Sequence, residues 1–190
     1  MKEHKFPYES FIGGWYIDPK ICDGIVDIFK ENPQEQRPGV IGGPFSVNKK
    51  SKDSIDIGVD PHWKEPRYWA WKQALKECCT LYEEKYPELS HFKPWGLVEG
   101  VNIQYYPPGG GYFVPHVERG SIHENRNLVF MTYLNDVPEG GTHFKYQKLT
   151  TPAKKGLTLI WPTDFTHVHS DQITKEHEKY IITGWFGFLK

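Results

Sequence analysis

Three things that this 190-residue sequence lacks limit what the protein can be. It contains three cysteines, and no two of them form a Cys-x-x-Cys pair. An odd number of cysteines without that spacing argues against a disulfide framework or a zinc knuckle and is typical of reduced thiols. No apolar run approaches the length of a bilayer, and the amino terminus lacks the apolar core of a signal peptide. We therefore expect a cytoplasmic protein without a membrane partner.

The sequence also lacks an excess of charge of either sign, because 23 lysine and arginine residues face 24 aspartate and glutamate residues. The lysines are scattered, whereas a nucleic-acid binder usually carries a clustered basic surface. Nucleic acid is therefore not expected as a partner. A hydrophobic content of 38% and an aromatic content of 15% indicate a globular protein. The length suits one domain over residues 1–190.

We expect residues 1–95 to form a region of helices and loops that supports the rest of the chain. Asp18 and Pro19 read as an N-cap and a first helical residue, and apolar residues then recur at helical spacing over residues 19–31. A second apolar stripe runs over about residues 66–86. Residues 32–66 are rich in proline, glycine and lysine, which predicts loops with one short strand.

Residues 96–190 change to short β-like runs that glycine and proline separate, and no useful helical period interrupts them. The runs lie at 97–106, 112–117, 127–135, 142–147, 156–161, 166–169 and 180–189. That many short strands predict a jelly roll, or double-stranded β-helix, of the cupin type. The predicted fold class is thus mainly β, with the N-terminal helices bracing one sheet from outside.

A histidine and a carboxylate stand two residues apart just after a glycine-rich turn. Side chains at positions i and i+2 of a strand point to the same side, so His116 and Glu118 can converge on one ion. The alternative is an ordinary polar pair. His167 and His169, which follow a proline break, offer a third ligand. Two histidines and one carboxylate form the facial triad that suits non-haem iron(II).

Lys179 stands at the start of the last apolar run. A cation inside a barrel is costly unless it has an anionic partner. The sequence therefore leaves two interpretations of Lys179: it binds an acidic ligand, or it lies at a solvated strand end.

The order of these motifs resembles that of the 2-oxoglutarate- and iron(II)-dependent dioxygenases, specifically the prolyl 4-hydroxylase-like branch. The pieces are Tyr-x-x-Gly, His-x-carboxylate, Tyr-Leu-Asn, a Gly-Gly element that ends in Phe, Pro-x-x-x-x-His and a basic residue. They fall at 106–109, 116–118, 133–135, 140–144, 162–167 and 179. The resemblance covers roughly residues 96–190 and extends more loosely to the N-terminal helices. It implies a hydroxylase that uses Fe(II), 2-oxoglutarate and O2, releases succinate and CO2, and acts most often on a prolyl residue in a peptide or protein.

The resemblance also implies a role for individual residues. Those expected to hold iron are His116, Glu118 and His167, and those expected to hold 2-oxoglutarate are Lys179, Tyr106 and Tyr133. Glu118 departs from the aspartate of most members. Lys179 lies twelve residues after His167 but ten after His169, so His169 stays open as the distal ligand. The alternative for either tyrosine is a core residue with a polar end.

Two other classes of function stay open on the sequence alone. A cupin-like metal protein would bind an ion through His167 and His169 without oxygenase activity, and it would give Lys179 no role. A β-sandwich binding module would use every histidine structurally. Within the oxygenase class, a free amino acid or another small molecule is the alternative to a prolyl substrate.

Overall fold

The computed structural model describes residues 1–41, 46–91 and 93–189. Residues 42–45, which belong to the predicted loop region, lie outside the described residues, as do residues 92 and 190. The two predicted helices are confirmed as α1 (Pro19–Glu31) and α2 (Pro66–Lys85). Each begins at an acidic N-cap, because the side chains of Asp18 and Glu65 accept hydrogen bonds from backbone N–H groups of the first turn. The short 3-10 helices are η1 (Tyr8–Ser10), η2 (Pro33–Glu35), η3 (Pro87–His91) and η4 (Phe165–His167).

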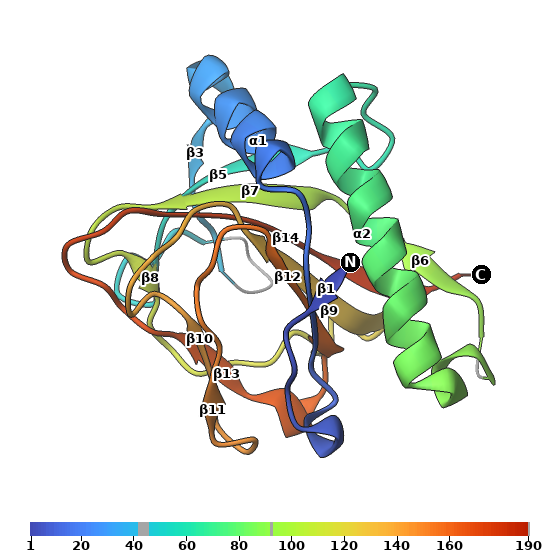
Figure 1. Cartoon of the computed structure of the whole chain (residues 1–190). Coiled ribbons are helices and arrows are strands. Elements are labelled where there is room, and N and C mark those ends of the chain that lie inside the picture. The colour runs from blue at the N-terminus through green and yellow to red at the C-terminus, as the bar shows by residue number, and fades with distance from the viewer. Residues whose placement is uncertain (42–45, 92, 190) are drawn as a thin grey trace.

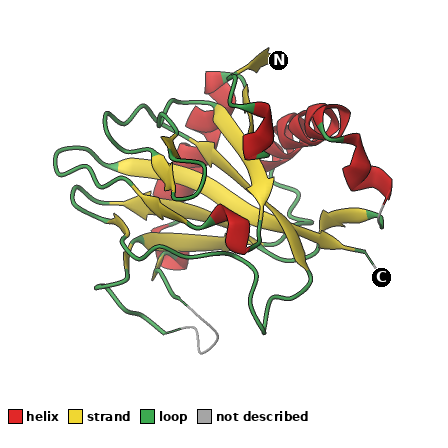
Figure 2. Cartoon of the chain, turned by 90° about the horizontal axis from the view of Figure 1, so that it is seen from below, coloured by secondary structure: helices red, strands yellow, loops and turns green. Residues whose placement is uncertain are grey.

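The main element is a nine-stranded sheet with the order β1-β2-β12-β9-β14-β7-β5-β3, to which β6 adds by pairing with β14. Figure 2 shows its strands running side by side with loops at their ends. Its strands are β1 (Lys2–Glu3), β2 (Gly13–Tyr16), β3 (Arg37–Pro38), β5 (Ile55–Val59), β6 (Trp95–Leu97), β7 (Val101–Tyr106), β9 (Arg126–Tyr133), β12 (Leu157–Pro162) and β14 (Lys179–Phe188). The described N-terminal half therefore adds strands to the main sheet, where the sequence predicted only helices, loops and one short strand.

Two smaller sheets complete the barrel. One has the order β11-β10-β13, and the other pairs β4 with β8. In Figure 1 these strands lie on the side of the main sheet away from α1 and α2. Their bounds are β4 (Lys52–Asp53), β8 (Gly111–Tyr112), β10 (Thr142–Phe144), β11 (Leu149–Thr150) and β13 (His169–Asp171).

The helices cover one face of the main sheet (Figure 1). Alternation along β7 shows the division, because Ile103 and Tyr105 belong to or pack against the core that includes α1 and α2, whereas Asn102, Gln104 and Tyr106 line a cavity on the other face. No helix in the described ranges is long and apolar enough to cross a bilayer.

A second core fills the space between the main sheet and the three-stranded sheet. It includes Met131 of β9, Phe144 of β10, Trp161 of β12 and Ile181 of β14. Two antiparallel sheets around a common interior are the arrangement of a jelly roll. The predicted fold class, a mainly β double-stranded β-helix braced by helices, is confirmed.

Candidate active site

His116 and His169 lie opposite each other in neighbouring chain segments. The backbone N–H of His116 donates to the carbonyl oxygen of His169 at 2.9 Å, and the reciprocal bond measures 3.0 Å. Residues paired in this way project their side chains to the same side, and the two rings are 4.4 Å apart between centroids. Glu118 joins them, since its Oε1 lies 3.3 Å from Nε2 of His116 and 3.4 Å from Nε2 of His169.

The backbone also fixes which nitrogen each ring presents. Nδ1 of His116 bonds to the carbonyl oxygen of Val114 at 2.9 Å, and Nδ1 of His169 bonds to that of His167 at 2.9 Å. A carbonyl oxygen can only accept, so both Nδ1 atoms carry the hydrogen and both Nε2 atoms face Glu118. The three potential ligand atoms lie within 4.8 Å of one another. The structure thus brings together His116, Glu118 and His169.

His167, which the sequence favoured as the distal ligand, lies outside this group. The prediction assumed that residues 167 and 169 share a strand, but His167 ends the 3-10 helix η4, and β13 begins only at His169. Nε2 of His167 donates to the carbonyl oxygen of Ser10 at 2.9 Å, so that nitrogen is not free to bind an ion. Burial lowers the pKa of this ring, which favours its neutral form.

The side chains of Glu118 and His116 shift each other's pKa. Burial alone would raise the pKa of Glu118, but hydrogen bonds from His116 and His169 outweigh it and hold this pKa well below its usual range. Burial would lower the pKa of His116, but the bond to Glu118 and its charge hold that pKa above the usual value. The Glu118 carboxyl is therefore held in its charged form, and the raised pKa of His116 favours a proton on that ring. A bound cation would displace that proton.

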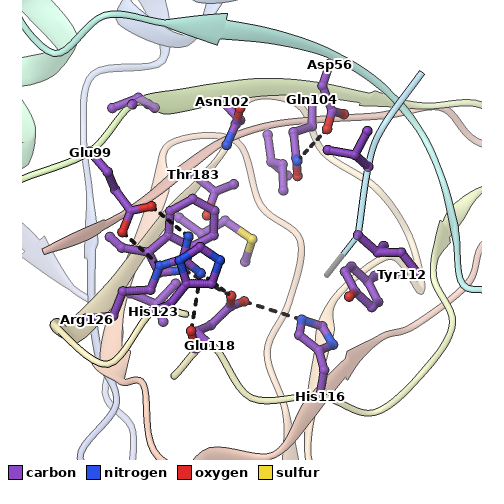
Figure 3. A pocket seen from close by; sticks show the side chains of 18 of the residues that line it. Asp56, Glu99, Asn102, Gln104, Tyr112, His116, Glu118, His123, Arg126 and Thr183 are labelled. Atoms are coloured by element: carbon purple, nitrogen blue, oxygen red, sulfur yellow. Dashed lines mark hydrogen bonds and ion pairs between the residues drawn. The ribbon is translucent and has the colours of Figure 1, made fainter. Parts of the chain in front are cut away.

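The group lies in a cavity of about 800 Å³. Figure 3 shows His116 and Glu118 pointing toward each other, with Tyr112 beside His116. The rings of Tyr112 and His116 stack with 3.8 Å between centroids. Other polar residues of the wall include Asp56, Glu99, Asn102, Gln104, Arg126 and Thr183.

Lys179 lies inside the barrel and not at a solvated strand end, because only 3% of its side chain is exposed. Its Nζ lies 3.1 Å from Oδ2 of Asp171, 3.4 Å from the carbonyl oxygen of Gly140 and 4.8 Å from the centre of the Tyr106 ring. The backbone N–H of Tyr112 donates to the same Asp171 oxygen at 2.8 Å. The buried cation therefore already has an anionic partner within the chain.

The two tyrosines that the sequence placed beside a carboxylate lie in different surroundings. Tyr106 lines the cavity and donates its hydroxyl hydrogen to Oε1 of Gln104 at 2.9 Å. The Tyr133 hydroxyl bonds to those of Thr142 and Thr151, at 2.8 and 2.9 Å. Tyr133 therefore matches the interpretation as a core tyrosine, and Tyr106 remains the candidate that faces the cavity.

Asp171, Arg126 and Trp185 also line the cavity, and the sequence alone gave none of them a part in ligand binding. Simple alternation could have found two of them. Asp171 is two residues beyond His169, and Trp185 is six residues beyond Lys179 on β14, so both share a face with a residue of the site. Arg126 offers no such signal, because it follows a loop.

Comparison with known proteins gives an independent result. The family described as the 2OG-Fe(II) oxygenase superfamily matches residues 101–187. No curated protein sequence matches the chain.

Several solved structures share the fold. A Pseudomonas putida prolyl-4-hydroxylase superposes with a TM-score of 0.71 at 15% identity, covering 95% of this chain and 94% of the other. A viral collagen prolyl hydroxylase from Paramecium bursaria Chlorella virus-1, solved with 2OG, gives 0.67 at 16% identity over 94% and 97%. A Trichoplax adhaerens prolyl hydroxylase, solved with a peptide of hypoxia inducible factor, gives 0.76 at 12% identity over 94% and 84%. At these identities the likeness establishes the fold.

Proposed function

We propose that the chain is a 2-oxoglutarate- and Fe(II)-dependent oxygenase and that it hydroxylates a prolyl residue in a peptide or protein. The match to the 2OG-Fe(II) oxygenase superfamily over residues 101–187 supports the first part of this proposal. The observation that carries the proposal is the convergence of His116, Glu118 and His169. Three solved relatives of the fold are prolyl hydroxylases, and one of them was solved with a peptide. Those relatives support the choice of substrate class.

The donor set fits the metal that the superfamily uses. Two neutral imidazole nitrogens and one carboxylate oxygen form the facial set that suits non-haem iron(II) and leaves positions open for other ligands. We propose His116, Glu118 and His169 as the iron ligands. Their Nδ1–H bonds to backbone carbonyl oxygens keep both rings oriented and keep both Nε2 atoms unprotonated when metal is bound.

We propose that Lys179 holds the distal carboxylate of 2-oxoglutarate, with Tyr106 beside it. Lys179 has three N–H donors, and two of them are directed at Asp171 and Gly140. A carboxylate bound here would have to compete with Asp171 for the ammonium group. Tyr106 and Asp171 line the cavity, and the centre of the Tyr106 ring lies 4.8 Å from Nζ of Lys179. These residues fit the cosubstrate, although the ion pair with Asp171 must share Lys179 with it.

When bound, Fe(II), 2-oxoglutarate and O2 would supply the oxidation, in which one oxygen atom of O2 would enter a substrate C–H bond and the other would enter succinate with release of CO2. The protein binds, orients and excludes water. Tyr112 packs on the His116 ring, and Trp161 packs edge-on to His169 at 5.2 Å between centroids. These rings limit the movement of the two imidazoles.

The proposal is tested by an assay of catalytic turnover. Protein purified without oxygen is incubated with Fe(II), 2-oxoglutarate, O2 and a panel of proline-containing peptides. Succinate formation and the gain of one oxygen atom by a peptide, seen by mass spectrometry, would support the proposal. Succinate without any peptide product, but with oxidation of a free amino acid or another small molecule, would keep the chemistry and replace the substrate.

A further inference from the structure

Glu118 has a second carboxylate oxygen that faces away from the histidines. Nε1–H of Trp185 donates to this atom, Oε2, at 3.0 Å. Nη1 of Arg126 lies 3.6 Å from Oε2 and donates to the backbone carbonyl oxygen of Glu118 at 3.2 Å. The two carboxylate oxygens therefore have separate partners, with the imidazoles at Oε1 and the indole and guanidinium groups at Oε2.

The donors at Oε2 are themselves fixed. The guanidinium carbon of Arg126 lies 3.6 Å from the centre of the Trp185 ring, so the cation stacks on the indole. Glu99 holds Arg126 from the other side through two bonds, at 2.8 Å to Nε and 2.7 Å to Nη2. Figure 3 shows Arg126 between Glu99 and Glu118. Paired planar bonds of this kind orient an arginine strongly.

We propose that Trp185 and Arg126 are positioning residues that hold Oε2 of Glu118, so that Oε1 alone is offered to the metal. Glutamate has one more rotatable bond than aspartate, and an unheld glutamate would lose more freedom on binding a metal ion. An aspartate at 118 would be one methylene shorter and would not reach both the indole N–H and the point that the histidines share. The surroundings of position 118 thus favour glutamate over aspartate. This inference rests on the metal site proposed above.

Trp185→Phe tests the proposal, because it keeps an aromatic ring beneath Arg126 and removes the N–H donor. Affinity is measured by titrating the metal-free protein with Co(II), which stands in for Fe(II) and reports through visible absorption. We expect roughly a tenfold loss of Co(II) affinity, at the lower end of what loss of a bond to a metal ligand causes. The thermal unfolding of the metal-free variant shows whether it is folded.

A matched control is available on β6. Trp95 also donates its indole N–H to a carboxylate, Oε1 of Glu83, at 3.1 Å, and it does not line the cavity around Glu118. Trp95→Phe therefore removes the same kind of bond elsewhere. It should leave Co(II) affinity unchanged. Equal affinities of Trp185→Phe and Trp95→Phe would overturn the proposal.

Glu118→Asp gives a second, independent arm. We expect it to weaken Co(II) binding although it installs the commoner residue of the family. In the Trp185→Phe background the same change should lower Co(II) affinity by a smaller factor, because the indole N–H that the longer glutamate side chain reaches is no longer present. Tighter binding by Glu118→Asp alone would refute the inference. If Trp185→Phe does not fold, Glu99→Gln loosens Arg126 from outside, and a Co(II) affinity equal to that of the unaltered protein would count against it.

These outcomes separate the inference from the proposal on which it rests. If the unaltered protein does not bind Co(II), the proposed metal site is refuted. If the unaltered protein and Trp185→Phe bind Co(II) equally well, only the positioning role of Trp185 is refuted.

Discussion

The two proposed binding regions inside the barrel, the metal end around Glu118 and the cosubstrate end around Lys179, are prepared in different ways. At the metal end His116, Glu118 and His169 converge, and Arg126 and Trp185 lie at the other oxygen of the carboxylate. At the cosubstrate end the cation of Lys179 is already paired with Asp171. On the proposed assignment, a metal ion would meet ligands that already converge, whereas an anion at Lys179 must compete with an internal carboxylate. The comparison predicts that metal affinity depends on preformed geometry and that cosubstrate affinity depends on a competition.

The largest effect is expected from substitution of a histidine at the metal end. We expect His169→Ala to abolish metal binding and His167→Ala to retain it, because Nε2 of His169 faces Glu118 whereas Nε2 of His167 bonds to Ser10. Thermal unfolding with and without metal measures this. A metal ion at a hundredfold excess over its dissociation constant stabilises a folded protein by about 2.7 kcal/mol, and His169→Ala should lose that gain.

The pair of variants also carries its own control. His167→Ala removes a buried ring and its bond to Ser10, so it should lower the stability of the metal-free protein by about 1–3 kcal/mol while keeping the metal-dependent gain. The opposite result, in which His167→Ala loses the gain and His169→Ala keeps it, would return the distal ligand to His167.

The second largest effect is expected from substitution of Lys179 at the cosubstrate end. We expect removal of the Lys179 charge to weaken 2-oxoglutarate binding by roughly 10- to 100-fold, since a bond to a charged group contributes about 1.5–3 kcal/mol. Lys179→Met alone would leave Asp171 buried and unpaired, which is itself destabilising. The double variant Lys179→Met with Asp171→Asn avoids that problem. Calorimetric titration with 2-oxoglutarate measures the change, and an affinity equal to that of the unaltered protein would exclude Lys179 from this role.

A smaller effect of opposite sign would sharpen the comparison. Asp171→Asn removes the competing charge but keeps a carbonyl oxygen for the Tyr112 N–H. We expect 2-oxoglutarate to bind roughly three- to tenfold more tightly, which corresponds to about 1 kcal/mol. Metal affinity is the internal control and should not change. Weaker cosubstrate binding would mean that Asp171 supports the site and does not compete in it.

Much of the fold followed from local pattern. The N-cap and proline at Asp18 and Pro19 predicted the start of α1, and the strand-like runs predicted the barrel. β2 was missed, because its sequence Gly-Gly-Trp-Tyr is short and rich in glycine, which has low strand propensity. Its neighbours β1 and β12 give that segment extended partners. The local sequence of one segment does not determine which distant segment it pairs with.

The candidate site shows the same limit more sharply. His116 and Glu118 could be paired from their spacing, but the choice between His167 and His169 depended on where a 3-10 helix ends, to within one residue. Boundaries of that kind are the least predictable feature of a sequence. The pairing of Lys179 with Asp171 brings together β14 and β13, so it required the tertiary structure.

The smallest expected effect concerns the two tyrosines. Tyr133→Phe should leave 2-oxoglutarate affinity within about twofold, because the lost hydroxyl binds only Thr142 and Thr151, and it should cost about 1 kcal/mol of stability. Tyr106→Phe removes a hydroxyl that faces the cavity beside Lys179, so its affinity loss should exceed that of Tyr133→Phe. Titration of both variants decides. A larger loss for Tyr133→Phe would mean that the cosubstrate end extends past the threonines, deeper into the barrel than the cavity does now.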